Sequence, residues 1–129
     1  MSEARQFSIH YTREEARRLL PQIEEWLQKL THLNGRLQKL STRVQQLMAS
    51  GHDRGGATVE EYLKAQSTCL EIFGEFERRQ ILVKDLSRGL VDFPAILGGR
   101  EVFLCWERGE EDIEFWHEID AGYAGRERL

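Results

Sequence analysis

The sequence has 129 residues, of which 31% are charged and 40% hydrophobic, and its formal net charge is −4. This composition is typical of a globular protein rather than a disordered one, and the length suffices for one domain. The negative net charge argues against nucleic acid and anionic membrane surfaces as partners. We therefore expect a single domain that binds neither.

Two features of the sequence bear on location. The first residues lack the basic and apolar pattern of a secretion signal, and no apolar run approaches the ~20 residues that cross a bilayer. Cys69 and Cys105 lie in unrelated segments. We expect both to be free thiols in a reducing cytoplasm.

The chain begins with a short strand pattern, because Phe7 and Ile9 alternate with polar neighbours over residues 6–10. A helix start follows. Thr12 and Glu15 have the spacing of a capping box, in which each side chain bonds the backbone of the other. The sequence thus predicts a strand at 6–10 and a helix from residue 12.

The first helix carries an apolar seam with alternating steps of four and three residues, typical of a coiled coil. The seam consists of Leu19, Ile23, Trp26, Leu30, Leu33, Leu37, Leu40, Val44 and Leu47. It keeps its register through Pro21 and through the turn-like pair Asn34-Gly35. We expect one long helix bent near Pro21, with a break at Gly35 as the alternative.

A glycine-rich stretch over residues 51–57 predicts the tip of a hairpin. The second helix is then expected to run to about residue 88, with the seam Val59, Tyr62, Gln66, Cys69, Phe73, Phe76, Gln80 and Val83. The two helices would form an antiparallel hairpin over residues 12–88. A two-helix hairpin leaves apolar edges exposed, so we expect a homodimer through the helices.

The last third reads as β-structure. Residues 90–93 form a short extended piece that ends at Pro94, and residues 101–106 and 113–119 predict a strand hairpin around a turn at 107–110. Residues 121–129 read as irregular. The strands at 6–10 and 90–119 would form one sheet, which gives an α+β fold with a small antiparallel sheet at the open end of the helical hairpin.

Several short strings of residues carry a family resemblance. They are residues 89–95 (GLVDFPA), 104–106 (LCW), 109–110 (GE), 116–118 (WHE), 121–122 (AG) and 125–126 (GR), and at the start 7–8 (FS), 14–16 (EEA) and 20–21 (LP). In these strings the sequence resembles a bacterial family catalogued as domain of unknown function 2203. It implies a small bacterial cytoplasmic protein. No established activity or catalytic residue comes with it.

Polar side chains are dense in the C-terminal segment. The candidate ligand-binding residues are Asp92, Arg100, Glu110, Trp116 and Arg126. Arg100 and Arg126 each follow glycine and could hold an anion, but internal pairing of Arg126 with Asp92 or Asp120 is the favoured alternative.

A divalent metal is possible but not favoured. His117 and Asp120 are the candidate ligands, and Asp92, His10 or Cys105 could join them. His117 and Glu118 point to opposite faces of a strand, and the spacing fits no standard motif. The alternative is a histidine at the edge of the core, bonded to a carboxylate. Cys105 could also approach His117 as a nucleophile, but its apolar neighbours indicate a buried, inert thiol.

Two classes of function follow. The first is a dimerising helical-hairpin interaction or ligand-binding module with a polar site in the C-terminal segment. The second is a small metal- or anion-dependent enzyme that uses Asp92, His117, Asp120 and Arg126. The basic stripe Lys29, Arg36 and Arg43 on the first helix is interpreted as its solvated side.

Overall fold

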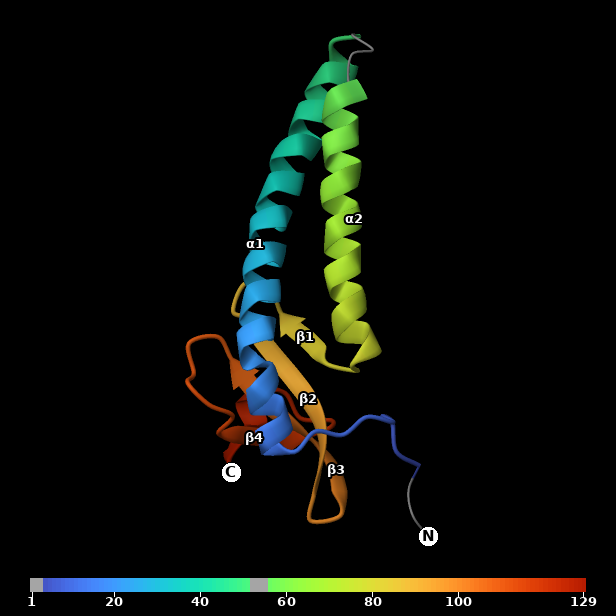
Figure 1. Ribbon diagram of the computed structural model, residues 1–129. Coiled ribbons are helices and arrows are strands. Elements are labelled where there is room, and N and C mark those ends of the chain that lie inside the picture. The colour runs from blue at the N-terminus through green and yellow to red at the C-terminus, as the bar shows by residue number, and fades with distance from the viewer. Residues whose placement is uncertain (1–3, 52–55) are drawn as a thin grey trace.

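The computed structural model describes residues 4–51 and 56–129. Helix α1 (Arg13–Ala49) and helix α2 (Gly56–Arg78) lie side by side and antiparallel, as an arm that rises from a five-stranded sheet (Figure 1). The strands are β1 (Leu82–Asp85), β2 (Leu90–Leu97), β3 (Arg100–Glu107), β4 (Phe115–Glu118) and β5 (Glu127–Arg128). They pair in sequence order, each antiparallel to the next. The α+β class is confirmed.

Helix α1 begins as predicted. The Glu15 N–H donates to Thr12 Oγ1 over 3.1 Å, and the Thr12 N–H donates to the Glu15 carboxylate over 3.0 Å. The helix then continues through Pro21 and Gly35 without interruption, so the alternative break at Gly35 is wrong. Pro21 lies on the exposed side, where its missing hydrogen bond leaves the apolar face of the helix intact.

Helix α2 ends ten residues before the predicted end at 88. Gln80 adopts a left-handed backbone with φ of +56°, and the Ile81 N–H returns to the Phe76 carbonyl over 3.0 Å. This is a Schellman cap, which usually has glycine at the left-handed position and therefore escapes sequence inspection when glutamine occupies it. The chain then turns into β1, a strand that the sequence analysis missed.

The seam predicted for α2 is also displaced. The residues buried against α1 and the sheet are Ala65, Cys69, Ile72 and Phe76, whereas Val59 and Phe73 are 38% and 41% exposed. The helix carries apolar side chains around about half its circumference, so a seven-residue pattern fits two different stripes. The predicted tip at 51–57 falls mostly on residues 52–55, outside the described ranges.

The sheet confirms the predicted antiparallel pairing of the segments at 101–106 and 113–119. The extended piece predicted to end at Pro94 instead continues to Leu97. β1 pairs with β2 only as far as Asp92, so β1 would accept no hydrogen bond from a backbone N–H at position 94, the group that proline lacks. The Pro94 carbonyl accepts from the Tyr11 N–H over 2.7 Å. Proline is therefore tolerated inside this strand.

Residues 6–10 do not form the predicted strand. Their backbone N–H groups bond side chains rather than a neighbouring strand. Those of Gln6 and Phe7 donate to the Glu101 carboxylate over 2.8 and 3.1 Å, and those of Ser8 and Ile9 donate to Gln80 Oε1 over 2.9 Å each. We call residues 6–10 the N-terminal strap. Alternating apolar and polar residues occur in an extended segment of this kind as well as in a strand, so the pattern alone does not distinguish the two.

The two faces of the sheet have different roles. The inner face packs Val91, Phe93, Leu104 and Trp106 against the helices in the main hydrophobic core. The outer face carries Asp92, Cys105 and His117, because side chains alternate along each strand. In the parts of the chain that the structure describes, neither helix contains an apolar segment of the kind that spans a bilayer.

Candidate functional site

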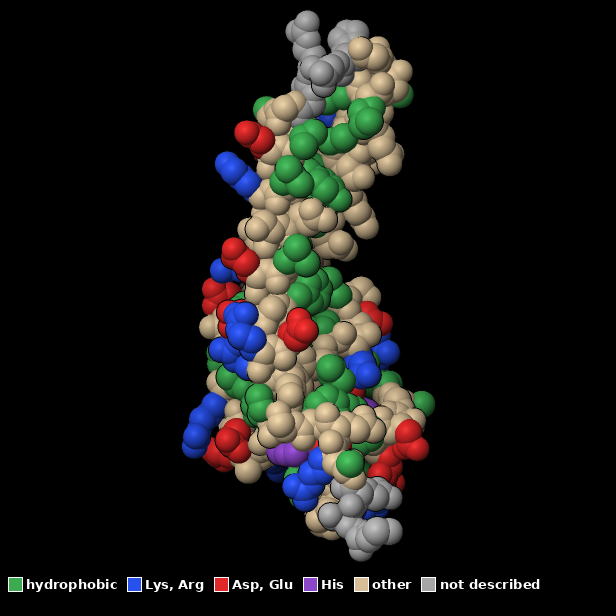
Figure 2. Space-filling model, turned by 90° about the vertical axis from the view of Figure 1, so that its right-hand side faces the viewer, with side chains coloured by type: hydrophobic (Ala, Val, Ile, Leu, Met, Phe, Trp, Pro, Cys, Tyr) green, Lys and Arg blue, Asp and Glu red, His purple; other side chains and the backbone are tan. Residues whose placement is uncertain are grey.

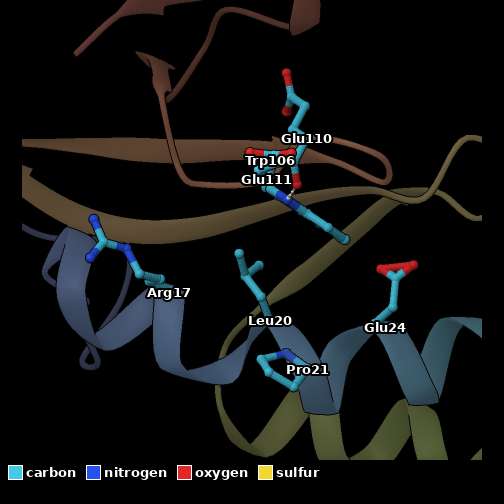
Figure 3. A pocket seen from close by; sticks show the side chains of 7 residues that line it. All are labelled: Arg17, Leu20, Pro21, Glu24, Trp106, Glu110 and Glu111. Atoms are coloured by element: carbon cyan, nitrogen blue, oxygen red, sulfur yellow. Dashed lines mark hydrogen bonds between the residues drawn. The ribbon is translucent and has the colours of Figure 1, made fainter.

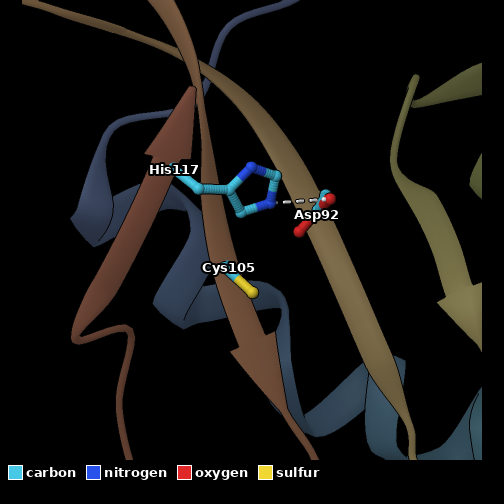
Figure 4. A group of neighbouring side chains, drawn as sticks. All are labelled: Asp92, Cys105 and His117. Carbon is cyan, nitrogen blue, oxygen red and sulfur yellow. Dashed lines mark hydrogen bonds and ion pairs between the residues drawn. The ribbon is translucent and has the colours of Figure 1, made fainter. Parts of the chain in front are cut away.

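The outer face holds a cluster of three buried polar side chains from three neighbouring strands (Figure 4). Asp92 on β2 lies directly opposite Cys105 on β3. His117 on β4 pairs with Phe103, two residues before Cys105, so it lies diagonally across from the thiol. One ligand atom from each residue lies within 4.8 Å of the other two. Exposed fractions are 2%, 0% and 2% for Asp92, Cys105 and His117.

Both ring nitrogens of His117 have partners. Nδ1 lies 2.7 Å from the Glu118 carbonyl oxygen, which only accepts, so Nδ1 carries a hydrogen. Nε2 lies 3.0 Å from Asp92 Oδ2, so one further proton is shared between these two atoms. The backbone of β4 thereby fixes the orientation of the ring.

This arrangement does not support nucleophilic catalysis by Cys105. Burial, and then the nearby Asp92 charge, raise the pKa of the thiol to about 12, although Arg126 opposes the rise. A cysteine nucleophile needs a lowered pKa and an accessible sulfur. Neither ring nitrogen of His117 is left to accept the thiol proton, since one faces a carbonyl and the other Asp92.

One oxygen of the cluster lacks a partner. Asp92 Oδ1 is buried and makes no adequate hydrogen bond within the described parts of the chain. The Cys105 thiol interacts with the Asp92 carboxylate, but not in hydrogen-bond geometry. A buried carboxylate oxygen without a donor is costly and needs an explanation.

Arg126 lies near enough to the cluster for its charge to act on Cys105. Its side chain is 9% exposed, its guanidinium carbon lies 3.8 Å from the Phe115 ring centre and 4.6 Å from that of Tyr123, and Nη2 donates to Glu110 Oε2 over 2.6 Å. Burial opposes the charge on Arg126, but the hydrogen bond to Glu110, the charge of that glutamate and further neighbours together outweigh it and raise the arginine's pKa. Internal pairing thus involves Glu110, rather than the expected Asp92 or Asp120.

The structure brings together only some of the candidate residues. Asp92, His117, Arg126 and Glu110 gather around Cys105, whereas Arg100 pairs with Glu118 on an exposed part of the surface. Trp116 packs on the inner face with the core, and Asp120 is exposed. From the sequence, Cys105 is a possible additional ligand, a possible nucleophile or an inert thiol. Its place opposite Asp92 depends on strand register, which the sequence does not give.

A separate pocket of about 370 Å³ lies between α1 and the loop after β3 (Figure 3). Its lining residues are Arg17, Leu20, Pro21, Glu24, Trp106, Glu110 and Glu111. The Trp106 indole N–H donates to the Glu110 carbonyl over 2.9 Å and is therefore not offered to a ligand. Arg17 is the cationic residue of this lining and already pairs with Asp112 over 2.8 Å, so the pocket does not favour the anion expected from the sequence.

Comparison with known proteins places the chain in a family without adding a function. A helical hairpin seated on an antiparallel sheet, with a buried polar cluster on the outer face, defines a small α+β protein. Residues 10–129 match the family described as an uncharacterized conserved protein, DUF2203, and the chain belongs to that family. The searches found no curated protein and no solved structure that matches the chain.

Proposed function

We propose that this protein is a dimerising interaction module and that α2 pairs with the α2 helix of a second copy. The observation that carries the proposal is a second apolar stripe on α2, formed by Val59, Leu63, Leu70 and Phe73. These side chains are 38%, 54%, 66% and 41% exposed. Figure 2 views the molecule from the α2 side and shows hydrophobic side chains in patches along the arm.

The spacing of this stripe favours a helix as the partner. With Gln66 included, the positions follow steps of four, three, four and three residues. That period keeps a stripe facing a neighbouring helix over its whole length, as in a coiled coil. A helix with apolar residues around half its circumference is typical of four-helix bundles, in which each helix contacts two others.

The order of residues favours a second copy, arranged antiparallel. The stripe is nearly symmetric about Gln66, since Val59 and Phe73 lie equally far from it, and Leu63 and Leu70 nearly so. A two-fold axis at Gln66 would place Val59 against Phe73, and Leu63 against Leu70, of the other chain. Such a self-complementary patch is what a closed two-fold dimer requires. Gln66 would meet its own equivalent, a polar contact that fixes register.

Sedimentation of the full chain at micromolar concentration tests the proposal. The wild-type protein should be a dimer, and Leu70→Glu should be a monomer because a charge then lies in the apolar seam. Thr68→Glu adds the same charge on a different side of α2 and should remain dimeric. A monomeric wild-type protein, or a dimer that survives Leu70→Glu, would refute the helical interface.

Cysteine crosslinking tests the antiparallel arrangement. Seven residues separate Val59 from Gln66, about 10 Å along the helix, so the two Val59 side chains would lie roughly 20 Å apart. Gln66→Cys should therefore form a disulfide between chains and Val59→Cys should not. Efficient crosslinking through Val59→Cys would show a parallel pair instead.

The small-enzyme alternative rests on the buried cluster, but its members are closed off from solvent and His117 is bonded to Asp92. We place the protein in the cytoplasm of a bacterial cell, on the basis of its two free, buried cysteines and of its resemblance to a bacterial family. The negative net charge supports a partner other than nucleic acid.

A further inference from the structure

The cluster on the outer face offers three different donor atoms to one point in space. They are the Asp92 carboxylate, the Cys105 sulfur and His117 Nε2, all within 4.8 Å of one another and all buried (Figure 4). In a tetrahedral zinc site the bonds of about 2.0 to 2.3 Å place the donors about 3.5 Å apart. Small side-chain rotations would close the difference, and Nε2 and Asp92 Oδ2 are already 3.0 Å apart.

The orientation of His117 suits a metal ligand. Its Nδ1–H donates to the Glu118 carbonyl oxygen over 2.7 Å, which directs Nε2 toward Asp92. Histidines that bind metal usually donate their other N–H to a carbonyl or carboxylate in this way, since that bond fixes the tautomer and the ring.

The unpartnered oxygen is the second, independent observation. Asp92 Oδ1 lies buried without a hydrogen bond within residues 4–51 and 56–129. In Figure 4 the His117 ring, the Asp92 carboxylate and the Cys105 sulfur lie at the corners of a triangle, so an ion held by the three residues would contact this carboxylate. Leaving such an atom unsatisfied destabilises the fold, more so if it is charged, and a cation would remove that cost.

Charge also balances. Without an ion, the thiol keeps its proton and one proton is shared between His117 Nε2 and Asp92 Oδ2. A divalent cation would displace both protons, leaving a thiolate, a neutral imidazole and a carboxylate around two positive charges. The site would stay neutral, and the neighbouring Arg126 and Glu110 already neutralise each other. Buried charge is tolerated when it is balanced in this way.

We propose that Asp92, Cys105 and His117 bind one Zn²⁺ ion. The ion would link β2, β3 and β4 on the outer face of the sheet. The donor set selects the metal, because thiolate and imidazole suit Zn²⁺, whereas Mg²⁺ and Ca²⁺ prefer all-oxygen sites. Three protein ligands leave the fourth zinc position to a non-protein ligand. The proposal does not depend on dimerisation, since the cluster lies on the sheet and the dimer stripe lies on α2.

Cobalt substitution of the full chain tests the site. Co²⁺ is added to the folded protein and, because the cluster is buried, also during refolding from urea under reducing conditions. We expect one Co²⁺ per chain and a thiolate-to-cobalt charge-transfer band. We also expect Zn²⁺ to displace the cobalt and to raise the unfolding temperature.

Two cysteine variants test which sulfur atom binds the metal. Cys105→Ala removes the proposed ligand but keeps a small apolar side chain in the core, and it should lose the band and the Zn²⁺-dependent stabilisation. Cys69→Ala removes the other buried thiol and should keep both. The proposal is overturned if neither loading method gives a thiolate band, if the band survives Cys105→Ala, or if Zn²⁺ stabilises Cys105→Ala as much as wild type.

Discussion

His117 Nε2 lies 3.0 Å from Asp92 Oδ2, and both side chains are only 3% exposed. The pair connects β4 to β2 across the intervening strand β3, so it joins strands that do not pair directly. Buried polar partners depend on each other, because removing one leaves the other without its bond in a medium of low polarity. The pair is therefore part of what holds the outer face together.

His117→Ala should lower the free energy of unfolding by about 3–5 kcal/mol in metal-free protein, since it leaves the Asp92 carboxylate buried without a partner. Urea unfolding followed by circular dichroism would measure the change. Asp120→Ala is a matched control three residues away on the exposed surface, and its effect should stay within about 0.5 kcal/mol. Equal effects of the two substitutions would refute the structural role of the pair.

Arg126→Ala should also destabilise the fold, by about 2–4 kcal/mol, because the guanidinium packs on two aromatic rings and pairs with Glu110 while almost fully buried. Arg128 offers the comparison, since its side chain is 71% exposed and its guanidinium carbon lies 5.1 Å from the same Phe115 ring. Arg128→Ala should have little effect on the urea midpoint. If Arg126→Ala is equally mild, the arginine is not a structural element and is free to bind a ligand.

The helical hairpin could be predicted because its signals are local and redundant. Thr12 and Glu15 mark the start of α1, and the apolar seam continues through Pro21 and Gly35 although each of these residues alone suggests a break. The end of α2 could not be predicted, because its cap uses Gln80 in a left-handed conformation that side chains rarely adopt. Because this cap was not recognised, the predicted helix end was too late and β1 was missed.

The candidate site was predictable in composition but not in geometry. Asp92, Arg126 and His117 were candidates because polar side chains are dense in the C-terminal segment, and the sequence alone correctly placed His117 and Glu118 on opposite faces. Which side chains come into contact depends on strand register and on how the C-terminal residues 121–129 pack back against the sheet. The Asp92–Cys105 pairing and the Arg126–Glu110 bond arise from those long-range features.

Gly89 occupies a position that only glycine fits. Its φ is +67°, and a Cβ added there would lie 2.5 Å from Arg108 Cβ, whose backbone N–H donates to the Gly89 carbonyl over 3.0 Å. Gly89→Ala should cost about 2–4 kcal/mol, combining left-handed strain with the steric overlap. Gly98 has a similar φ of +60° but nothing within 4 Å of an added Cβ, so Gly98→Ala should cost only about 1–2 kcal/mol. Chemical denaturation of both variants measures the difference, and Gly98→Ala being the more harmful would contradict the overlap.

The N-terminal strap should loosen in acid. Although burial opposes the charge on Glu101, hydrogen bonds from His10 and from the Gln6 and Phe7 N–H groups outweigh it and lower the carboxyl's pKa. A carboxyl whose pKa is lowered in the folded state stabilises the fold above its ordinary pKa of about 4.3, and this contribution is lost as the pH falls through the folded-state pKa.

Glu101→Gln should therefore cost about 1–3 kcal/mol at neutral pH and progressively less as the pH falls below that ordinary value, because wild type then also lacks the negative charge. Guanidinium unfolding of both proteins across this range measures the difference in stability. Repeating the comparison in a His10→Ala background removes the imidazole partner of Glu101 and leaves the two backbone donors. Because the strap packs Phe7 against Phe103 with ring centres 5.4 Å apart, the acid-induced loss should also appear as faster amide exchange at residues 6–10. A stability difference that stays constant with pH would mean that the Glu101 charge does not hold the strap.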